Sequence, residues 1–122
     1  MGMNSREENK EITYTEAELK MGEIVDSKYK FHLPVNTDKL WEIGKTMCSA
    51  VGYYSRKVLA KDCVIVVLES DGYPIVCIEL SEDLKFLIQA KILNNGKPTG
   101  FEKHLVLEWM KKHNIESKTT DL

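Results

Sequence analysis

The chain has 122 residues, of which 43% are hydrophobic and 30% are charged, a balance typical of one globular domain. Its formal net charge of −2 lacks the basic excess that drives non-specific binding to duplex nucleic acid. The chain has three cysteines, Cys48, Cys63 and Cys77, which are too few for a disulfide scaffold and cannot all pair with one another because their number is odd. Because the three histidines are scattered as well, we expect no metal site and no cofactor.

Both ends of the chain are polar, and neither can bury enough apolar area to offset the entropy of ordering. We therefore predict a disordered arm over residues 1–11, one domain over residues 12–114 and a flexible tail over residues 115–122. No apolar run approaches the roughly 20 residues of a membrane span, and the first residues do not resemble a signal peptide. Free thiols suit a reducing compartment, so we expect a cytoplasmic protein with no membrane association.

The first part of the domain is the least regular. Residues 15–22, TEAELKMG, predict a short helix that Gly22 ends. Residues 28–35, KYKFHLPV, alternate enough to predict a short strand, which Pro34 ends because proline cannot donate to a sheet.

The longest helical pattern covers residues 36–62, with Asn36 or Thr37 as its cap. Apolar residues recur on one face at steps of three or four residues: Leu40, Ile43, Met47, Val51, Tyr54 and Val58. Gly44 and Gly52 lie inside the pattern, and each costs about 1 kcal/mol relative to alanine. Two explanations are open: close approach of another backbone, or a break near Gly52 that gives two shorter helices.

Three strands follow. Residues 63–69 form a continuous apolar run, which predicts a strand buried on both faces. A turn at Asp71-Gly72 leads to a second strand over residues 74–80, and residues 84–93 form a third. In the third strand, alternation places Phe86, Ile88, Ala90 and Ile92 on one face and Leu87, Gln89, Lys91 and Leu93 on the other.

The last helix follows a loop and begins after Thr99, which has the spacing of a capping box with Glu102. Asn114 is a suitable left-handed stop. The order helix, three strands, helix, with tight turns between the strands, predicts an α+β fold. We expect an antiparallel sheet of three to four strands, with a long helix before it and a C-terminal helix packed on the same face.

Few residues suggest chemistry. Cys48 would need a nearby base to act as a nucleophile, and a small buried core residue is the favoured interpretation. Glu79 is more informative because it interrupts an apolar strand, as a buried, partnered or ligand-facing carboxylate would. Gln89 and Lys91 share a strand face near Asn94, which predicts a hydrogen-bonding surface for a polar or phosphate-bearing ligand; the alternative is a face exposed to water.

Four stretches occur in the order of a known family: IGKTMCSAVGYYSRKV at 43–58, PIVCIEL at 74–80, IQAKILNN at 88–95 and VLEWMKK at 106–112. Over residues 33–112 the chain resembles the PcfJ-like domain of conjugative plasmids and related mobile elements. The His-His-Cys of that family falls here on Cys48, Ser49 and Ala50, and its preceding glutamate falls on Ile43. The resemblance therefore implies a binding module rather than an enzyme.

The expected function is a small non-catalytic module of a phage, plasmid or other mobile element that binds, and can sequester, a nucleotide-like ligand or a nucleic-acid element. The candidate ligand-binding residues are Tyr53, Arg56, Glu79, Gln89, Lys91 and Asn94. One alternative is a protein-interaction module anchored by Trp41 and an exposed sheet edge. Another is an enzyme that uses Glu79 as acid or base. A homodimer or a higher homo-oligomer is expected in each case.

Overall fold

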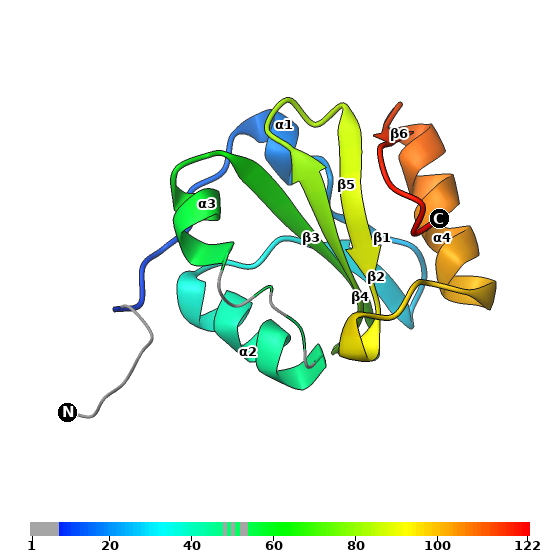
Figure 1. Cartoon of the computed structure of the whole chain (residues 1–122), viewed down its shortest axis with the longest axis horizontal. Helices are drawn as coiled ribbons and strands as arrows, with labels where there is room; N and C mark the ends of the chain where they lie inside the picture. The colour runs from blue at the N-terminus through cyan, green and yellow to red at the C-terminus, as the bar shows by residue number, and fades with distance from the viewer. Residues whose placement is uncertain (1–7, 48, 50, 52–53) are drawn as a thin grey trace.

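The structure is a computed structural model that describes residues 8–47, 49, 51 and 54–122 (Figure 1). Its helices are α1 (Glu16–Leu19), α2 (Thr37–Met47), α3 (Ser55–Leu59) and α4 (Gly100–Lys112), with a 3₁₀ turn η2 (Leu93–Asn95). Its strands are β1 (Glu23–Ile24), β2 (Tyr29–His32), β3 (Cys63–Ser70), β4 (Tyr73–Ser81), β5 (Phe86–Lys91) and β6 (Glu116–Ser117). The α+β class predicted from the sequence is therefore confirmed.

The strands form one six-stranded sheet in the order β1-β2-β3-β4-β5-β6. Neighbours are antiparallel except β5 and β6, which are parallel. The predicted antiparallel sheet of three to four strands is thus too small, and the sheet is mixed. The strands missed at its two edges, β1 and β6, have two residues each, which is too short to show a period-2 pattern.

Helices cover both faces of the sheet, so the prediction that they share one face is wrong. The side chains of β3 alternate between two hydrophobic clusters: Val64, Val66 and Leu68 pack with α4, whereas Cys63, Ile65 and Val67 pack with α2 and α3. We call these sides the α4 face and the α2–α3 face. Figure 1 shows α2 and α3 on one side and α4 on the other. The physical reason is that β3 is apolar at every position from Cys63 to Leu68, so both of its faces need cover.

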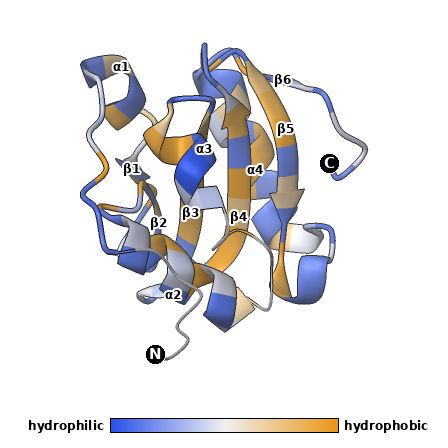
Figure 2. Ribbon diagram, turned by 60° about the vertical axis from the view of Figure 1, so that its left-hand side comes forward, coloured by the Kyte–Doolittle hydropathy of each residue, from blue (hydrophilic) through white to orange (hydrophobic). Residues whose placement is uncertain are grey.

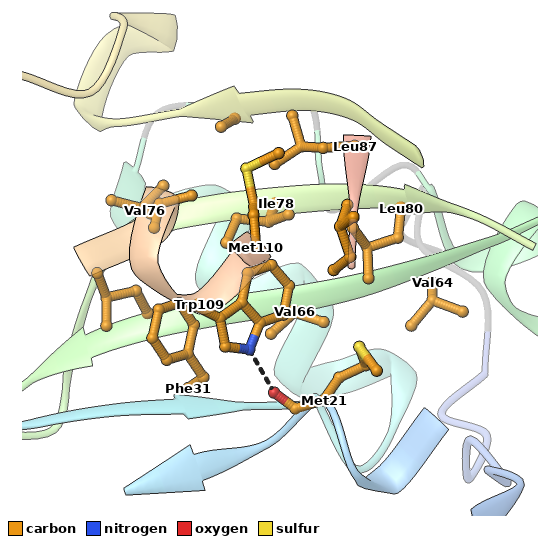
Figure 3. Close-up of a cluster of buried hydrophobic side chains, with 14 of the residues drawn as sticks. Met21, Phe31, Val64, Val66, Val76, Ile78, Leu80, Leu87, Trp109 and Met110 are labelled. Carbon is orange, nitrogen blue, oxygen red and sulfur yellow. Dashed lines mark hydrogen bonds between the residues drawn. The ribbon is translucent and has the colours of Figure 1, made fainter. Parts of the chain in front are cut away.

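The α4 face holds the larger cluster, centred on Trp109 (Figure 3). The Trp109 side chain is 2% exposed and stacks on Phe31, with ring centroids 4.9 Å apart. Its indole Nε1 donates a hydrogen bond to the Met21 carbonyl at 2.8 Å, which satisfies the single polar atom of a buried ring. Trp109 therefore joins α4 to the strands at the N-terminal edge of the sheet.

The α2–α3 face holds a smaller cluster, built from residues of the two helices and of β3 and β4. α2 ends at Met47 and α3 begins at Ser55, so two shorter helices replace the single helix of the longest pattern. Of the two explanations for the glycines, the one with two shorter helices agrees with these bounds, although Gly44 lies inside α2. Gly52 and Cys48 lie outside the described residues. Figure 2 shows that the central strands carry mainly hydrophobic residues.

The turn between β3 and β4 has the conformation that its sequence predicts. Asp71 has φ +51° and Gly72 has φ +85°, so both central residues of the hairpin are left-handed. A type I′ turn requires this combination, and its twist matches that of the flanking strands. The turn places Ser70 opposite Tyr73, and a bulge at Ile75 then shifts the register by one residue, so that Ile65 lies opposite Glu79.

A bulge in β5 changes the predicted alternation. Glu79 pairs with Gln89 but Leu80 pairs with Leu87, so Ile88 is the additional residue. Leu87 therefore points into the α4 face together with Ala90, although strict alternation had placed it beside Gln89. A bulge re-aims the side chains that follow it, and here it separates the buried Leu87 from the polar pair formed by Gln89 and Lys91.

The first described residues lie against the start of α2. The Asn9 carboxamide oxygen accepts the Asp38 backbone N–H at 3.0 Å, and the Lys10 backbone N–H donates to the Thr37 hydroxyl at 2.9 Å. The predicted arm covers residues 1–11, and residues 1–7 lie outside the described part.

The C-terminal residues, for which a flexible tail was predicted, lie along the outer edge of β5. β6 pairs with the start of β5, and the Lys118 backbone N–H then donates to the Leu87 carbonyl at 2.8 Å. Further along, the Asp121 side chain is 5% exposed. Residues 116–121 therefore cover the outer edge of β5, whose backbone groups would otherwise be open to pairing.

The two ends of α4 test the cap predictions. Asn114 has φ +56°, and the N–H groups of Asn114 and Ile115 donate to the carbonyls of Lys111 and Met110, which is a Schellman motif. The left-handed stop is thus confirmed. At the other end, the Thr99 side chain makes no cap hydrogen bond, so the predicted capping box is wrong. The next residue, Gly100, has φ +55°, and this turns the entering backbone away from the geometry that a capping box needs.

Candidate functional site

A cavity of about 250 Å³ lies on the α2–α3 face, over the paired strands β4 and β5. The residues that line it are Ser49, Val51, Tyr54, Ile65, Cys77, Glu79, Gln89, Lys91 and Asn95. One wall is apolar and comes from the core, whereas the floor carries a carboxylate, an amide and an amine side by side. A largely apolar pocket with a few convergent polar groups is the usual form of a small-molecule site.

Glu79 is the buried acid of this cavity, with 6% of its surface exposed. Its Oε2 lies 3.2 Å from the Lys57 ammonium, which reaches down from α3. The Lys57 ammonium also lies 4.7 Å from the centre of the Tyr54 ring. The hydrogen bond to Glu79 raises the pKa of Lys57 above its usual value. A buried carboxylate needs such a partner to remain charged, so α3 and β4 are joined by an ion pair at the cavity.

Gln89 lies opposite Glu79 on the neighbouring strand. Its amide Nε2 donates to the Tyr54 hydroxyl at 2.9 Å. The bond uses the amide nitrogen and leaves the carbonyl oxygen of Gln89 as an acceptor, on the strand that pairs with that of Glu79. The β4–β5 pair thereby presents acceptor groups on adjacent strands, which suits a ligand that carries N–H donors.

Lys91 borders the same floor, one pleat further along β5. Its ammonium lies 2.8 Å from Asp121 Oδ1, and Asp121 Oδ2 accepts the Ala90 backbone N–H at 3.0 Å. Burial favours the neutral form of Asp121, but the bonds from Lys91, Ala90 and Thr119 outweigh it, so the pKa of Asp121 lies below its usual value. The C-terminal segment thus supplies a charged group to the border of the cavity.

The two described cysteines are unsuited to nucleophilic chemistry. Burial, reinforced by the negative charge of Glu79, raises the pKa of Cys63 to about 11 and that of Cys77 to about 12. A thiol must lose its proton to act as a nucleophile, so both remain protonated core residues near neutral pH. Cys48, the third cysteine, lies outside the described residues.

The structure brings together three of the six candidate residues, Glu79, Gln89 and Lys91. Asn95 lines the cavity in place of its predicted neighbour Asn94, which has φ +59° within η2. The other two candidates are Tyr53 and Arg56. Tyr53 lies outside the described residues, and Arg56 lies on α3 and is not among the described residues of the cavity wall.

The side chains that bond to Gln89, Glu79 and Lys91 had not been assigned to the site from the sequence; they are Tyr54, Lys57 and Asp121. Tyr54 was assigned to the core stripe, although a hydroxyl beside a core stripe is a polar group that needs a partner. Lys57 lies outside the apolar stripe of the longest helical pattern, and that pattern does not identify a partner for it. No local signal identifies Asp121, because its partners Ala90 and Lys91 lie about 30 positions earlier in the chain.

Within the described part of the chain, no group of three or more His, Cys, Asp and Glu side chains could hold a metal ion. The helices of that part are all too short or too polar to cross a membrane.

The charged groups at the cavity form two ion pairs, one between Lys57 and Glu79 and one between Lys91 and Asp121.

Comparison with known proteins gives one result. The family described as PcfJ-like protein matches residues 2–106, which include the α2–α3 face and all of β4 and β5. Searches of curated proteins and of solved structures returned no match. The matched range covers most of the sequence and agrees with the resemblance seen in the motifs. The chain belongs to the PcfJ-like protein family.

Proposed function

We propose that the chain is a small non-catalytic binding module of a mobile element, and that its ligand is a nucleotide or a nucleotide-like molecule. The observation that carries the proposal is the cavity on the α2–α3 face, where Glu79 and Gln89 lie opposite each other on paired strands. A stability role alone would favour apolar residues there, since burying polar groups costs free energy unless they find partners.

The size and chemistry of the cavity favour one base-sized ring. Its volume of about 250 Å³ lies just below the roughly 300–1,000 Å³ of typical ligand pockets. The Glu79 carboxylate and the Gln89 carbonyl accept hydrogen bonds, and such groups read the amino and imino edges of nucleobases. The apolar wall, with Val51 and Ile65, suits the faces of a planar ring.

The first test is native mass spectrometry of freshly purified protein before dialysis. We expect a mass that exceeds the subunit multiple by the few hundred daltons of a nucleotide. A nucleotide panel then gives a Kd for the best ligand. The double variant Gln89→Ala/Lys91→Ala is expected to lose binding while it remains folded, and a thermal melt measures the cost of leaving Asp121 without Lys91. Lys85→Ala, an exposed lysine just before β5, is the matched control and should bind normally. Binding that survives the double change would contradict the proposal.

A second candidate function is assembly with another copy of the chain. A shallow apolar groove of about 660 Å³ runs past α1, β1 and β2. At its border Leu19 is 56% exposed, Ile24 is 79% exposed and Val35 is 59% exposed. Ile24 lies in β1, at the edge of the sheet, and such an edge can pair with the same edge of a second copy. Light scattering tests this: Ile24→Lys should convert a dimer to a monomer, and a mass unchanged by this variant would oppose it.

A catalytic use of Glu79 as acid or base is the remaining alternative. The described cavity residues include no second carboxylate and no histidine to act with it. Glu79→Gln is the decisive variant, since loss of a pH-dependent turnover in it would establish catalysis.

A further inference from the structure

The Asp121 carboxylate is bound in the way that proteins bind a free anion. One oxygen accepts a backbone N–H, from Ala90 at 3.0 Å, and the other accepts from the Lys91 ammonium at 2.8 Å. The Asp121 residue is 5% exposed, so its carboxylate makes these two bonds in a largely buried position. Charge-assisted bonds of this kind hold carboxylates and phosphates alike.

The segment that carries Asp121 lies at the edge of the sheet, where Leu122 packs in part against the cluster of the α4 face and the Lys118 ammonium lies 4.3 Å from the centre of the Phe86 ring. Two residues of β6 pair with β5, and the backbone N–H groups of Glu116 and Lys118 donate to Lys85 and Leu87. The family match ends at residue 106, so this segment lies beyond the region shared with the family model. A short edge strand held by a few bonds opens at low free-energy cost compared with the whole domain.

We propose that the Ala90 N–H and the Lys91 ammonium form an anion-binding site, that Asp121 occupies it as an internal ligand, and that an oxyanion of the bound molecule displaces Asp121. The inference rests on the proposed function, because Lys91 belongs to both sites, and it adds the group that the cavity border recognises. A ligand whose ring lies against Glu79 and Gln89 reaches Lys91 with an attached phosphate or carboxylate, since Lys91 follows Gln89 on the same strand face.

The charges around the site permit this exchange. Glu79 is the nearest carboxylate on β4, and Lys57 compensates it at 3.2 Å. When Asp121 leaves, Lys91 retains a positive charge beside a backbone donor, and no described acid of the cavity wall other than Glu79 opposes an incoming anion. While Asp121 occupies the site, a free anion cannot bind there. The apparent affinity for the anion is therefore the intrinsic affinity multiplied by the fraction of time that the segment is released.

The test is titration of ¹⁵N-labelled full chain with two probes, inorganic phosphate and acetate. In the wild type we expect the Ala90 amide and the amides of residues 116–122 to shift together. Asp121→Asn keeps an acceptor for the Ala90 N–H but releases Lys91, and should bind phosphate about tenfold more tightly. Glu116→Gln removes the same charge from an exposed position of the same segment and should behave as the wild type.

The outcomes separate the two anions and the two proposals. Tighter binding of phosphate than acetate assigns a phosphate group, and the reverse assigns a carboxylate. Equal affinities of wild type and Asp121→Asn for both probes would overturn the inference, as would binding retained in Lys91→Met. The proposed function is judged separately with an uncharged nucleoside: if it shifts the Glu79 and Gln89 amides, the cavity binds a ring even when the anion site fails.

Discussion

The two faces of the sheet differ in what they bury. On the α4 face, Trp109 and Phe31 lie stacked within a cluster of aliphatic side chains, and the indole proton has its partner. On the α2–α3 face, the apolar cluster is smaller and gives way to the polar floor of Glu79, Gln89 and Lys91. The first arrangement maximises removal of apolar area from water, which stabilises the fold. The second retains charged groups that contribute little net stability.

The difference indicates a division of roles within one small sheet. The same strands, β3 to β5, supply both faces, so their alternation places a stability element and a binding element back to back. Substitutions on the α4 face should therefore change stability and leave the site intact in whatever protein remains folded. Substitutions of the polar floor residues Gln89 and Lys91 on the α2–α3 face should change binding more than they change stability.

The largest expected effect comes from Trp109→Ala. Loss of a fully buried aromatic side chain leaves a cavity and an unpaired Met21 carbonyl, so unfolding should become easier by about 3–5 kcal/mol. Chemical denaturation followed by circular dichroism measures the change. Leu107→Ala, at a 43% exposed position on the same helix, is the control and should cost less than about 1 kcal/mol. Equal losses in the two variants would contradict the central role of Trp109.

A smaller effect is expected from Lys57→Met, which leaves the buried Glu79 carboxylate without its partner. Because Lys57 is half exposed and water can replace part of its contribution, we expect a loss of about 1–2 kcal/mol. Adding Glu79→Gln should recover most of it, since the uncompensated charge is then gone. A double-mutant cycle by urea denaturation measures the coupling, and purely additive losses would show that the pair is not coupled.

Protonation of Asp121 at acidic pH should weaken the attachment of the C-terminal segment to β5. Its pKa is lower in the folded chain than in the unfolded chain, so its contribution to stability is present above about pH 4. That contribution is lost as the pH falls through the lowered folded value. The wild type should therefore lose more melting temperature than Asp121→Asn between about pH 5 and pH 3. Parallel curves for the two proteins would contradict an ionised Asp121 in the folded state.

The smallest effect concerns the helix caps. The Thr15 hydroxyl accepts the Glu18 N–H at 3.1 Å and the Glu18 carboxylate accepts the Thr15 N–H at 2.8 Å, so Thr15→Ala should cost about 1 kcal/mol. Thr99→Ala, at the start of α4, should cost almost nothing because its side chain makes no cap bond. Thermal melts of the two variants test this, and a larger loss at Thr99 would reverse the assignment.

Local sequence was sufficient for the features that depend on neighbouring residues. The apolar run of residues 63–69 indicated a strand covered on both sides, and Asp71-Gly72 indicated a hairpin turn that the structure contains. Asn114 indicated the end of α4. Each of these signals rests on backbone conformation or on side-chain period, both of which act over a few residues. The family motifs likewise predicted the family.

Tertiary contacts decided the rest. The bulge at Ile88, which separates Leu87 from Gln89, depends on pairing with β4 and has no signature in β5 itself. The partners of Glu79 and Lys91 come from α3 and from the C-terminal segment, 22 and 30 positions away. An acidic residue within an apolar strand, such as Glu79, indicates a buried charge that needs a partner, because an unpaired buried charge is costly. Only the folded chain determines which residue supplies that partner.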